Sequence, residues 1–226
     1  MDTSYMRTIL VTGGAGFIGS NYLNRFVRQY PNYFFINVDA LTYAGSLDNI
    51  DVAEKPNYVF EHVNICNTTS LSKVFDRYTP TDIIHFAAES HVDNSIKSPG
   101  IFIETNIVGT ENLLELARVH TIQRFHFIST DEVYGSLSLD DTPVTESAPL
   151  LPRSPYSASK AGAELLVRAY HETFGLNTVI TRASNNYGPH QHREKFIPVF
   201  ITQLSSGKKA TALWPSGENV RDWNLC

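Results

Sequence analysis

The sequence predicts an α/β fold built on a doubly wound parallel sheet, with the start of a smaller C-terminal lobe for substrate. Short apolar runs alternate with segments of helical length over the first 185 residues. Most of these runs are apolar throughout rather than at every second position, as expected for parallel strands covered on both faces. Strands that alternate with helices along a chain indicate a parallel sheet with helices packed on it.

The expected strands and helices follow one another in a regular order. Strands are expected at 8–13, 34–39, 58–63, 82–88, 125–130 and 177–183, where runs such as "TILVTG" and "FHFIST" occur. Helices are expected between them, at 17–30, 69–78, 99–119 and 156–174. In such sheets ligands bind outside the carboxyl ends of the strands, so the residues after each run are candidates for a site.

The pattern changes after residue 185. The segment "NNYGPHQHREKFIP" is typical of a loop, a short helix is expected at 196–206, and the sequence ends in "VRDWNLC". We therefore expect a first domain at 1–185 that carries the catalytic residues and a partial substrate-binding lobe at 186–226. That lobe has the pattern of a second domain that is cut short.

Composition and charge exclude several classes of protein. Hydrophobic residues make up 42% of the 226 residues, enough for a core, and the net charge of −5 argues against a nucleic-acid partner held by a basic surface. Cys66 and Cys226 form neither a CxxC motif nor a disulfide framework. The first apolar run begins too early for a signal peptide, and no stretch has membrane-spanning length, so we expect a soluble cytoplasmic protein.

A glycine-rich turn follows the first expected strand. In "VTGGAGFIGS" the motif Gly14-x-Gly16-x-x-Gly19 is preceded by Gly13 and leads into a helix. Glycines there allow a tight turn and let a pyrophosphate approach the N–H groups at the helix start, as in a Rossmann-type domain. A turn that needs glycine only for its geometry is the alternative. Asp39 ends the second strand, where a carboxylate can bind both adenosine ribose hydroxyls and repel a 2′-phosphate, which favours NAD over NADP.

The motif "YSASK" places Tyr156 and Lys160 four residues apart, on one face of a helix. A phenol has an ordinary pKa of about 10, too high for a base at neutral pH. A nearby ammonium group and a positively charged nicotinamide would favour the phenolate and make it usable. An exposed Tyr–Lys pair without a function is the alternative, but beside a dinucleotide motif a base for an alcohol proton is expected.

Two adjacent acids, Asp131 and Glu132, follow the fifth expected strand in "STDEVYG". With this segment, the motifs "HFAAESHVDNSI", "TNIVGT", "SPYSASK", "SNNYGPHQHREKFIP" and "RDW" resemble the extended short-chain dehydrogenase/reductase family, and within it the sugar-nucleotide 4,6-dehydratases. The resemblance runs from about residue 7 to residue 223. Related epimerases carry the Tyr-x-x-x-Lys pair but are less similar at the acids.

The resemblance implies a hydro-lyase that uses NAD to oxidise the glucose C4 hydroxyl, loses water across C5 and C6, and returns hydride to C6. A C4 ketone acidifies the C5 hydrogen, which Glu132 would remove, and Asp131 would protonate the departing C6 hydroxyl. Thr130 would hydrogen-bond the sugar and Tyr156 would take its proton. Different surroundings can separate the pKa values of two such carboxyl groups. Acids that merely begin a helix or turn are the alternative.

The glycine motif and the resemblance together give a set of expected contacts. The expected NAD contacts are Gly13, Gly16, Phe17, Ile18, Gly19, Asp39, Thr42, Asn64, Ile65, Ala87, Ala88, Glu89, Thr105, Tyr156, Lys160 and Asn186. The expected contacts to the dTDP-glucose substrate are Ser90, Thr130, Asn185, Lys195 and Arg221, of which the two cations suit a diphosphate.

Several positions depart from the family pattern. Ala40, Asn64 and Asn94 stand where lysine, aspartate and arginine are usual, and "ALWPSG" replaces the segment that packs on the nucleotide base. Family members are about a third longer. We therefore keep two alternatives to the dehydratase, a sugar-nucleotide 4-epimerase and a truncated NAD-binding regulatory or assembly subunit without catalysis. The family forms homodimers through helices like 99–119 and 156–174, so a homodimer is expected.

Two histidines also fall near the expected site. His85 and His91 are six residues apart across the end of a strand, with no third ligand in register. We expect no metal, and we interpret His85 as a strand residue and His91 as a neighbour of the site.

Overall fold

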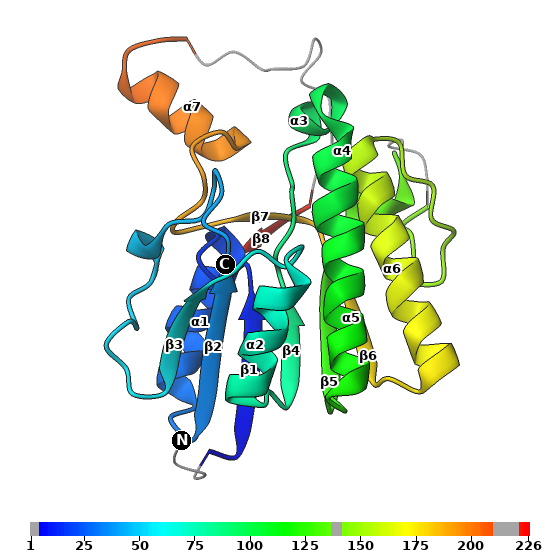
Figure 1. The fold of residues 1–226 in the computed structure, drawn as a ribbon. Coiled ribbons are helices and arrows are strands. Elements are labelled where there is room, and N and C mark those ends of the chain that lie inside the picture. Colours follow the sequence, from blue (N-terminus) through cyan, green and yellow to red (C-terminus); the bar gives the residue numbers. More distant parts are fainter. Residues whose placement is uncertain (1–4, 137–141, 210–221) are drawn as a thin grey trace.

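A six-stranded parallel sheet forms the centre of the computed structural model, which describes residues 5–136, 142–209 and 222–226 (Figure 1). Its strand order is β3-β2-β1-β4-β5-β6, so the chain first winds to one side of β1 and then to the other. This is the doubly wound arrangement, with its switch point between β1 and β4. The predicted fold class is confirmed. The strands are β1 (Arg7–Thr12), β2 (Tyr33–Asp39), β3 (Tyr58–His62), β4 (Asp82–His85), β5 (Arg124–Thr130) and β6 (Thr178–Ala183).

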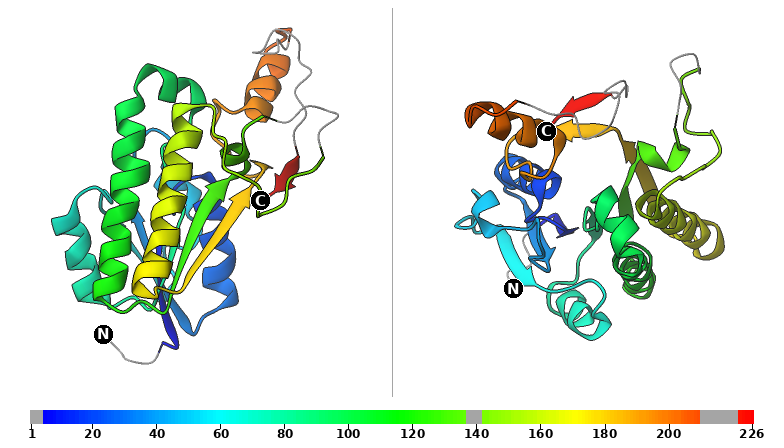
Figure 2. Two further views of the ribbon diagram at one scale, coloured as in Figure 1. Left: turned by 90° about the vertical axis from the view of Figure 1, so that its right-hand side faces the viewer. Right: turned by 90° about the horizontal axis from the view of Figure 1, so that it is seen from above.

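Helices cover both faces of the sheet, as Figures 1 and 2 show. Leu10 on β1 belongs to a core with α2 (Thr68–Tyr78), α5 (Gly109–Val119) and α6 (Pro155–Phe174). Its neighbours Ile9 and Val11 belong to a second core on the opposite face with α1 (Phe17–Gln29). Successive residues of a strand point to opposite faces, so continuously apolar strands can fill both cores.

The helix expected at 99–119 is present over its whole length but is not uniform. It consists of α4 (Pro99–Phe102), a π-helical segment η2 (Ile103–Val108), and α5. π-helical turns inside helices occur frequently at functional sites. Here the segment turns Asn106 inward, where its side chain is 1% exposed and contacts the loop after β4 and helix α6.

Strand β4 ends at His85, three residues before the expected end at 88. The reason is a change of hydrogen-bond partner. The N–H of Glu89 donates to Oδ1 of Asn106 at 2.9 Å, and the Glu89 carbonyl accepts from Nδ2 of Asn106 at 3.0 Å. The peptide groups are thus satisfied by a side chain rather than by a neighbouring strand, and the loop turns away from the sheet.

The residues after 185 form elements of their own beyond the carboxyl ends of the sheet (Figure 2). Strand β7 (Asn185–Tyr187) pairs in parallel with β8 (Trp223–Leu225), and α7 (Phe196–Ser205) lies between them in sequence. The expected helix at 196–206 is therefore present, whereas the expected loop contains a strand. The division at residue 185 stays a prediction.

Three short helical elements were also not expected from the sequence. They are η1 (Leu47–Asn49), α3 (Val92–Lys97) and η3 (Asp131–Tyr134). Each begins at a polar side chain that accepts a hydrogen bond from a backbone N–H two or three residues later, as N-caps do. Such short capped turns carry no hydrophobic period, so sequence periodicity does not reveal them.

We expect Gly19→Ala to destabilise the protein by about 2 kcal/mol, because a Cβ at Gly19 would lie 2.3 Å from the carbonyl oxygen of Gly13. Gly100→Ala is the matched control, since a Cβ there meets nothing within 4 Å. Replacing an unhindered helical glycine by alanine should instead be neutral or stabilising by about 0.5–1 kcal/mol. Urea denaturation measures the free energy of unfolding of both variants. Equal changes in that free energy would contradict the tight packing of α1 on the glycine turn.

Candidate active site

A cavity of about 810 Å³ opens at the carboxyl ends of the strands, at the switch point of the sheet. Loops after β1, β2, β4 and β5, the start of α6, and the segment after β6 contribute to its walls. Its size and position are those of a small-molecule site in an open α/β sheet. All sixteen expected cofactor contacts line this cavity, as do four of the five expected substrate contacts. The fifth, Arg221, lies outside the described residues.

The glycine turn leaves no room for side chains. Gly13 has a φ of +69°, and a Cβ there would lie 2.5 Å from the backbone nitrogen of Ala87. Helix α1 begins at Phe17, and its N-cap residue Gly16 offers no side chain to cap the first N–H groups. Free N–H groups at the start of a long helix suit a phosphate. The turn therefore fits the pyrophosphate of a dinucleotide.

Asp39 lies at the end of β2 beside this turn and is 9% exposed. Its Oδ2 accepts the N–H of Ala15 at 2.9 Å, and its Oδ1 accepts the N–H of Leu41 at 2.8 Å. Two backbone bonds fix the plane of the carboxylate, while each oxygen keeps acceptor capacity. Asp39 is thus a rigid acceptor at the edge of the cavity, where an adenosine ribose would be bound.

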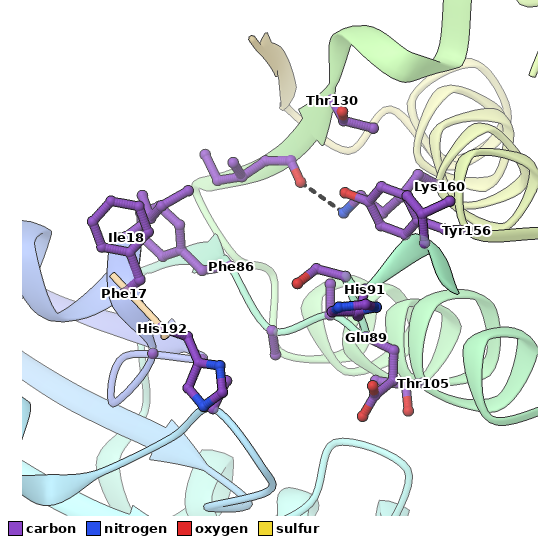
Figure 3. Close-up of a pocket in the computed structure, with 18 of the residues that line it drawn as sticks. Phe17, Ile18, Phe86, Glu89, His91, Thr105, Thr130, Tyr156, Lys160 and His192 are labelled. Atoms are coloured by element: carbon purple, nitrogen blue, oxygen red, sulfur yellow. Dashed lines mark hydrogen bonds between the residues drawn. The ribbon is translucent and has the colours of Figure 1, made fainter. Parts of the chain in front are cut away.

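Tyr156, Lys160 and Thr130 come together on the opposite wall (Figure 3). Nζ of Lys160 donates to the carbonyl oxygen of Ile128 at 2.7 Å and lies 4.1 Å from the ring centre of Phe127. Tyr156 and Thr130 line the same wall of the cavity, and Thr130 contributes to the electrostatic surroundings of the phenol. Strand β5 and helix α6 therefore present a phenol, a hydroxyl and an amine to one side of the cavity.

The surroundings of Tyr156 disfavour its ionised form. Desolvation, then the negative charge of Glu132, raises the pKa of the Tyr156 phenol, and Thr130 opposes this only in part. Lys160 is 3% exposed, and burial lowers its pKa from 10.5 to about 7, against the opposing effect of Glu164. In this structure the phenol is neutral at pH 7, so Lys160 alone does not make it a base.

The acid pair begins the short helix η3, with Asp131 and Glu132 both in its first turn. Oγ1 of Thr130 accepts the N–H of Glu132 at 3.2 Å and donates to Oδ1 of Asp131 at 3.3 Å. Glu132 lines the cavity, whereas Asp131 does not. The structure thus brings Glu132 together with Thr130, Tyr156 and Lys160 along the cavity, and Asp131 is bonded to Thr130 outside the lining.

The loop after β4 forms the floor between these two walls. Asn106 fixes Glu89 through both of its peptide groups and donates to Oγ of Ser159 on α6 at 2.8 Å. His85 is a strand residue, as expected, and it joins Thr12 to Thr110 through hydrogen bonds of 2.7 and 2.9 Å. Burial lowers the pKa of His85 well below its ordinary value, so this imidazole is neutral and structural.

The segment after β7 closes the cavity from the far side. Nζ of Lys195 donates to the carbonyl oxygen of Ser90 at 3.3 Å. Burial lowers the pKa of Lys195, and the charges of Glu194 and Glu132 counteract this. Lys195 and Glu132 therefore interact electrostatically across the cavity.

Sequence reasoning missed Tyr43, His192 and Glu194. The rings of Tyr43 and His192 meet edge to face, with 5.7 Å between their centres. Glu194 lies 3.6 Å from Nδ1 of His192 and 3.7 Å from Nε2 of His91, and its charge helps to raise the pKa of Glu89. These residues come from loops far apart in sequence, so no local spacing could have identified them. His91 lies beside the site, as expected.

Within the described ranges, no group of three histidine, cysteine, aspartate or glutamate side chains is placed to hold a metal ion. No helix in the same ranges combines the length and the apolar character needed to cross a membrane.

Comparison with known proteins agrees with this geometry. The family model described as GDP-mannose 4,6 dehydratase matches residues 10–226. The chain belongs to the GDP-mannose 4,6 dehydratase family. The matched residues include both the glycine turn and the described elements after β6.

One relative in the GDP-mannose 4,6 dehydratase family is the dTDP-glucose 4,6-dehydratase of Neisseria meningitidis serogroup B, which is 51% identical over 228 residues. That match covers 96% of this chain and 64% of the relative, so the chain spans just under two thirds of the relative's length.

Two solved structures show how closely the fold is shared. The dTDP-glucose 4,6-dehydratase DesIV of Streptomyces venezuelae, solved with NAD and TYD bound, has a TM-score of 0.91 and 47% identity, over 96% of this chain and 68% of that one. The UDP-glucose 4-epimerase of Thermotoga maritima, solved with UDP-glucose, has a TM-score of 0.87 and 30% identity, over 96% and 69%. The fold is common to both enzymes, while sequence identity favours the dehydratase.

We expect the stability of the chain to rise between pH 7 and pH 9 by about 2 kcal/mol more than that of Lys160→Met. Burial lowers the folded-state pKa of Lys160 from 10.5 to about 7. The unfolded state therefore binds more protons over this range, and stability increases as the pH rises. Urea denaturation at both pH values gives the difference.

Lys73→Met is the matched control, because Lys73 is exposed on α2 and this variant keeps Lys160, so its stability should rise with pH as that of the wild type does. A Lys160→Met variant whose stability follows that of the wild type at both pH values would show that the buried amine keeps its ordinary pKa.

Proposed function

We propose that the chain is an NAD-dependent dTDP-glucose 4,6-dehydratase, a hydro-lyase that forms dTDP-4-keto-6-deoxyglucose for deoxysugar biosynthesis. The observation that carries this proposal is the position of Thr130, whose hydroxyl bonds to the acid-bearing turn and which lines one cavity together with Tyr156 and Glu132. A dehydratase needs one set of groups for oxidation and another for elimination. The 51% identity to a protein named for this activity supports the choice of substrate.

The residues of this chain fit NAD as the cofactor. The glycine turn and the start of α1 would hold the pyrophosphate, Asp39 would accept from the ribose hydroxyls, and Ala87 to Glu89 would contact the nicotinamide half. The bound cofactor would accept hydride from the sugar and later return it. Ala40, Leu41 and Thr42 after Asp39 supply no cation for a 2′-phosphate.

Each reacting group has a role that its position allows. Thr130 and Tyr156 would bind the C4 hydroxyl, and Tyr156 would take its proton, with Lys160 holding positive charge nearby. Glu132, which lines the cavity, would remove the C5 hydrogen once C4 is a ketone. Asp131 would protonate the departing C6 hydroxyl, which requires its carboxyl group to leave Thr130 and turn into the cavity. Lys195, Ser90 and Asn185 would contact the sugar nucleotide, with Arg221 as a further predicted contact.

A sugar-nucleotide 4-epimerase is the second candidate. Its support is the fold shared with UDP-glucose 4-epimerases at a TM-score of 0.87. An epimerase needs oxidation at C4 but no elimination, so the acids Asp131 and Glu132 would have no role in it. A regulatory subunit that binds NAD without catalysis is a third candidate that nothing in the cavity favours.

We further propose a homodimer in the cytoplasm, where the pools of NAD and nucleotide sugars are found. Large apolar side chains are exposed along the helices expected at the interface, including Ile101, Ile103 and Val108 on α4 and η2, and Leu165 on α6. Burying such a surface favours association. Sedimentation should give about twice the chain mass of 25.3 kDa, and Leu165→Lys should shift the mass toward that of the single chain.

We expect the chain to bind NAD at least about tenfold more tightly than NADP, because Asp39 would repel a 2′-phosphate and a tenfold ratio needs only about 1.4 kcal/mol. Asp39→Asn should bring the two affinities within about threefold, since the amide keeps an acceptor and loses the charge. Calorimetric titration measures both affinities. Asp51→Asn, an exposed aspartate, should leave the preference intact. Equal wild-type affinities would contradict the role of Asp39.

We expect Glu132→Gln to slow dehydration of dTDP-glucose by about 10²–10⁴-fold, the range for loss of a general base. Glu54→Gln, an exposed loop residue, is the matched control and should turn over normally. Mass spectrometry and NMR of the product provide the measurement. In the wild type, deuterium at C4 should appear at C6 and one solvent deuteron should enter at C5. Deuterium that remains at C4 would support the epimerase instead.

A further inference from the structure

Arg182 on β6 joins four separate segments of the chain through one guanidinium group. Its Nε donates to the two carboxylate oxygens of Glu164 at 3.1 and 3.0 Å, and its Nη2 donates to Glu164 Oε2 at 2.7 Å. Its Nη1 donates to the hydroxyl of Tyr134 at 2.7 Å and to the carbonyl oxygen of Glu146 at 2.9 Å. The guanidinium also lies 4.9 Å from the centre of the Tyr134 ring.

One end of this cluster is fixed to the catalytic helix. The side chain of Glu164 is fully buried, and a buried carboxylate is tolerated only when it is paired and hydrogen-bonded. Glu164 lies four residues after Lys160 on α6, so the two side chains share a face of the helix. Its negative charge favours the charged form of Lys160. Arg182 therefore holds the helix that presents Tyr156 and Lys160.

The other end is fixed to the turn that carries the acids. Tyr134 is the last residue of η3, which begins with Asp131 and Glu132. At the front of this turn Thr130 pairs with Ala183, the residue after Arg182, across β5 and β6. At the back the turn is held by the Tyr134 hydroxyl and by a bond from the N–H of Leu151 to the carbonyl oxygen of Val133 at 2.9 Å.

We propose that Arg182 is a positioning residue that fixes the acid-bearing turn η3 against the Tyr156/Lys160 helix, with Glu164 and Tyr134 as its two anchors. The inference rests on the proposed function, because it assigns oxidation to α6 and elimination to η3. None of the three residues lines the cavity, so they act through the elements that they join. The cluster sets the distance between the phenol of Tyr156 and the carboxylate of Glu132.

The chain contains a second cluster of the same three residue types, which offers a control. Arg77 and Tyr78 at the end of α2 both contact Glu61 on β3, with Nη1 of Arg77 at 3.0 Å from its carboxylate. These three residues also lie outside the cavity lining. Tyr134→Phe and Tyr78→Phe thus remove the same hydroxyl from similar Arg–Glu–Tyr clusters, one beside the acid turn and one away from it.

The first test is amide hydrogen exchange of the purified chain, read by mass spectrometry. Tyr134→Phe should increase the exchange rate of amides in residues 131–135 about tenfold, because the turn loses a hydrogen bond to a charged group. Tyr78→Phe should leave the same amides unchanged. Unchanged exchange at 131–135 in Tyr134→Phe would overturn the proposal, whether or not the chain is a dehydratase.

The second test is steady-state turnover of dTDP-glucose. Tyr134→Phe should lower kcat for dehydration about tenfold and leave KM within twofold, since a small displacement of the base slows chemistry without removing a substrate contact. Tyr78→Phe should match the wild type in both constants. Equal losses in the two variants would overturn a positioning role in favour of general stability. A wild type without turnover would contradict the proposed function alone, and hydrogen exchange would still decide on Arg182.

Arg182→Lys and Arg182→Met separate charge from geometry. A lysine keeps the charge beside Glu164 but cannot donate to Glu164 and Tyr134 in the same fork. We expect both variants to show faster exchange at 131–135, with Arg182→Lys preserving more of the thermal stability than Arg182→Met. If Arg182→Lys had the same exchange rates at 131–135 and the same kcat as the wild type, the charge alone would be sufficient. That result would overturn the positioning role.

Discussion

The backbone N–H and carbonyl groups of the loop after β4 need hydrogen-bond partners outside the sheet. The position of the rest of the site depends on the side chain that supplies those partners. Unpaired peptide groups in such a buried place would cost about 1–3 kcal/mol each. Asn106 supplies both partners for Glu89, and its own position follows from the π-helical segment η2. The same amide reaches Ser159 on α6. The side chain of Asn106 thereby fixes the position of the loop under the cavity relative to the helix that carries Tyr156.

The sheet and its long helices could be predicted from the sequence because their signals are local. Continuous apolar runs identify buried parallel strands, and the glycine turn with Asp39 identifies a dinucleotide-type site. The path of the loop after β4 could not be predicted, since it depends on Asn106 seventeen residues away. Tyr43, His192 and Glu194 were missed for the same reason. The pKa of Tyr156 depends on desolvation and on the charge of Glu132, which the spacing of the Tyr-x-x-x-Lys motif does not show.

Burial shifts the pKa values of the titratable groups of the site away from the values that these groups have in water. The pKa of Tyr156 is raised, while those of Lys160 and Lys195 are lowered, and in all three cases desolvation is the first cause. Neutral forms are therefore favoured on both walls of the cavity. Such an arrangement costs folding stability, because groups that would be charged in the unfolded chain lose their hydration. It also brings the pKa of Lys160 to about 7, where an amine can exchange a proton at neutral pH, whereas the raised pKa of Tyr156 lies further from neutrality.

Thr130 offers an entering sugar only part of its hydrogen-bond valence. A hydroxyl can donate once and accept twice. Thr130 donates to Asp131 and accepts from the N–H of Glu132. A sugar hydroxyl that donates to Thr130 can use its second lone pair, whereas one that accepts from Thr130 must take the place of Asp131. Binding in the second way is therefore an exchange of partners, and the released carboxyl group becomes free to turn toward the sugar.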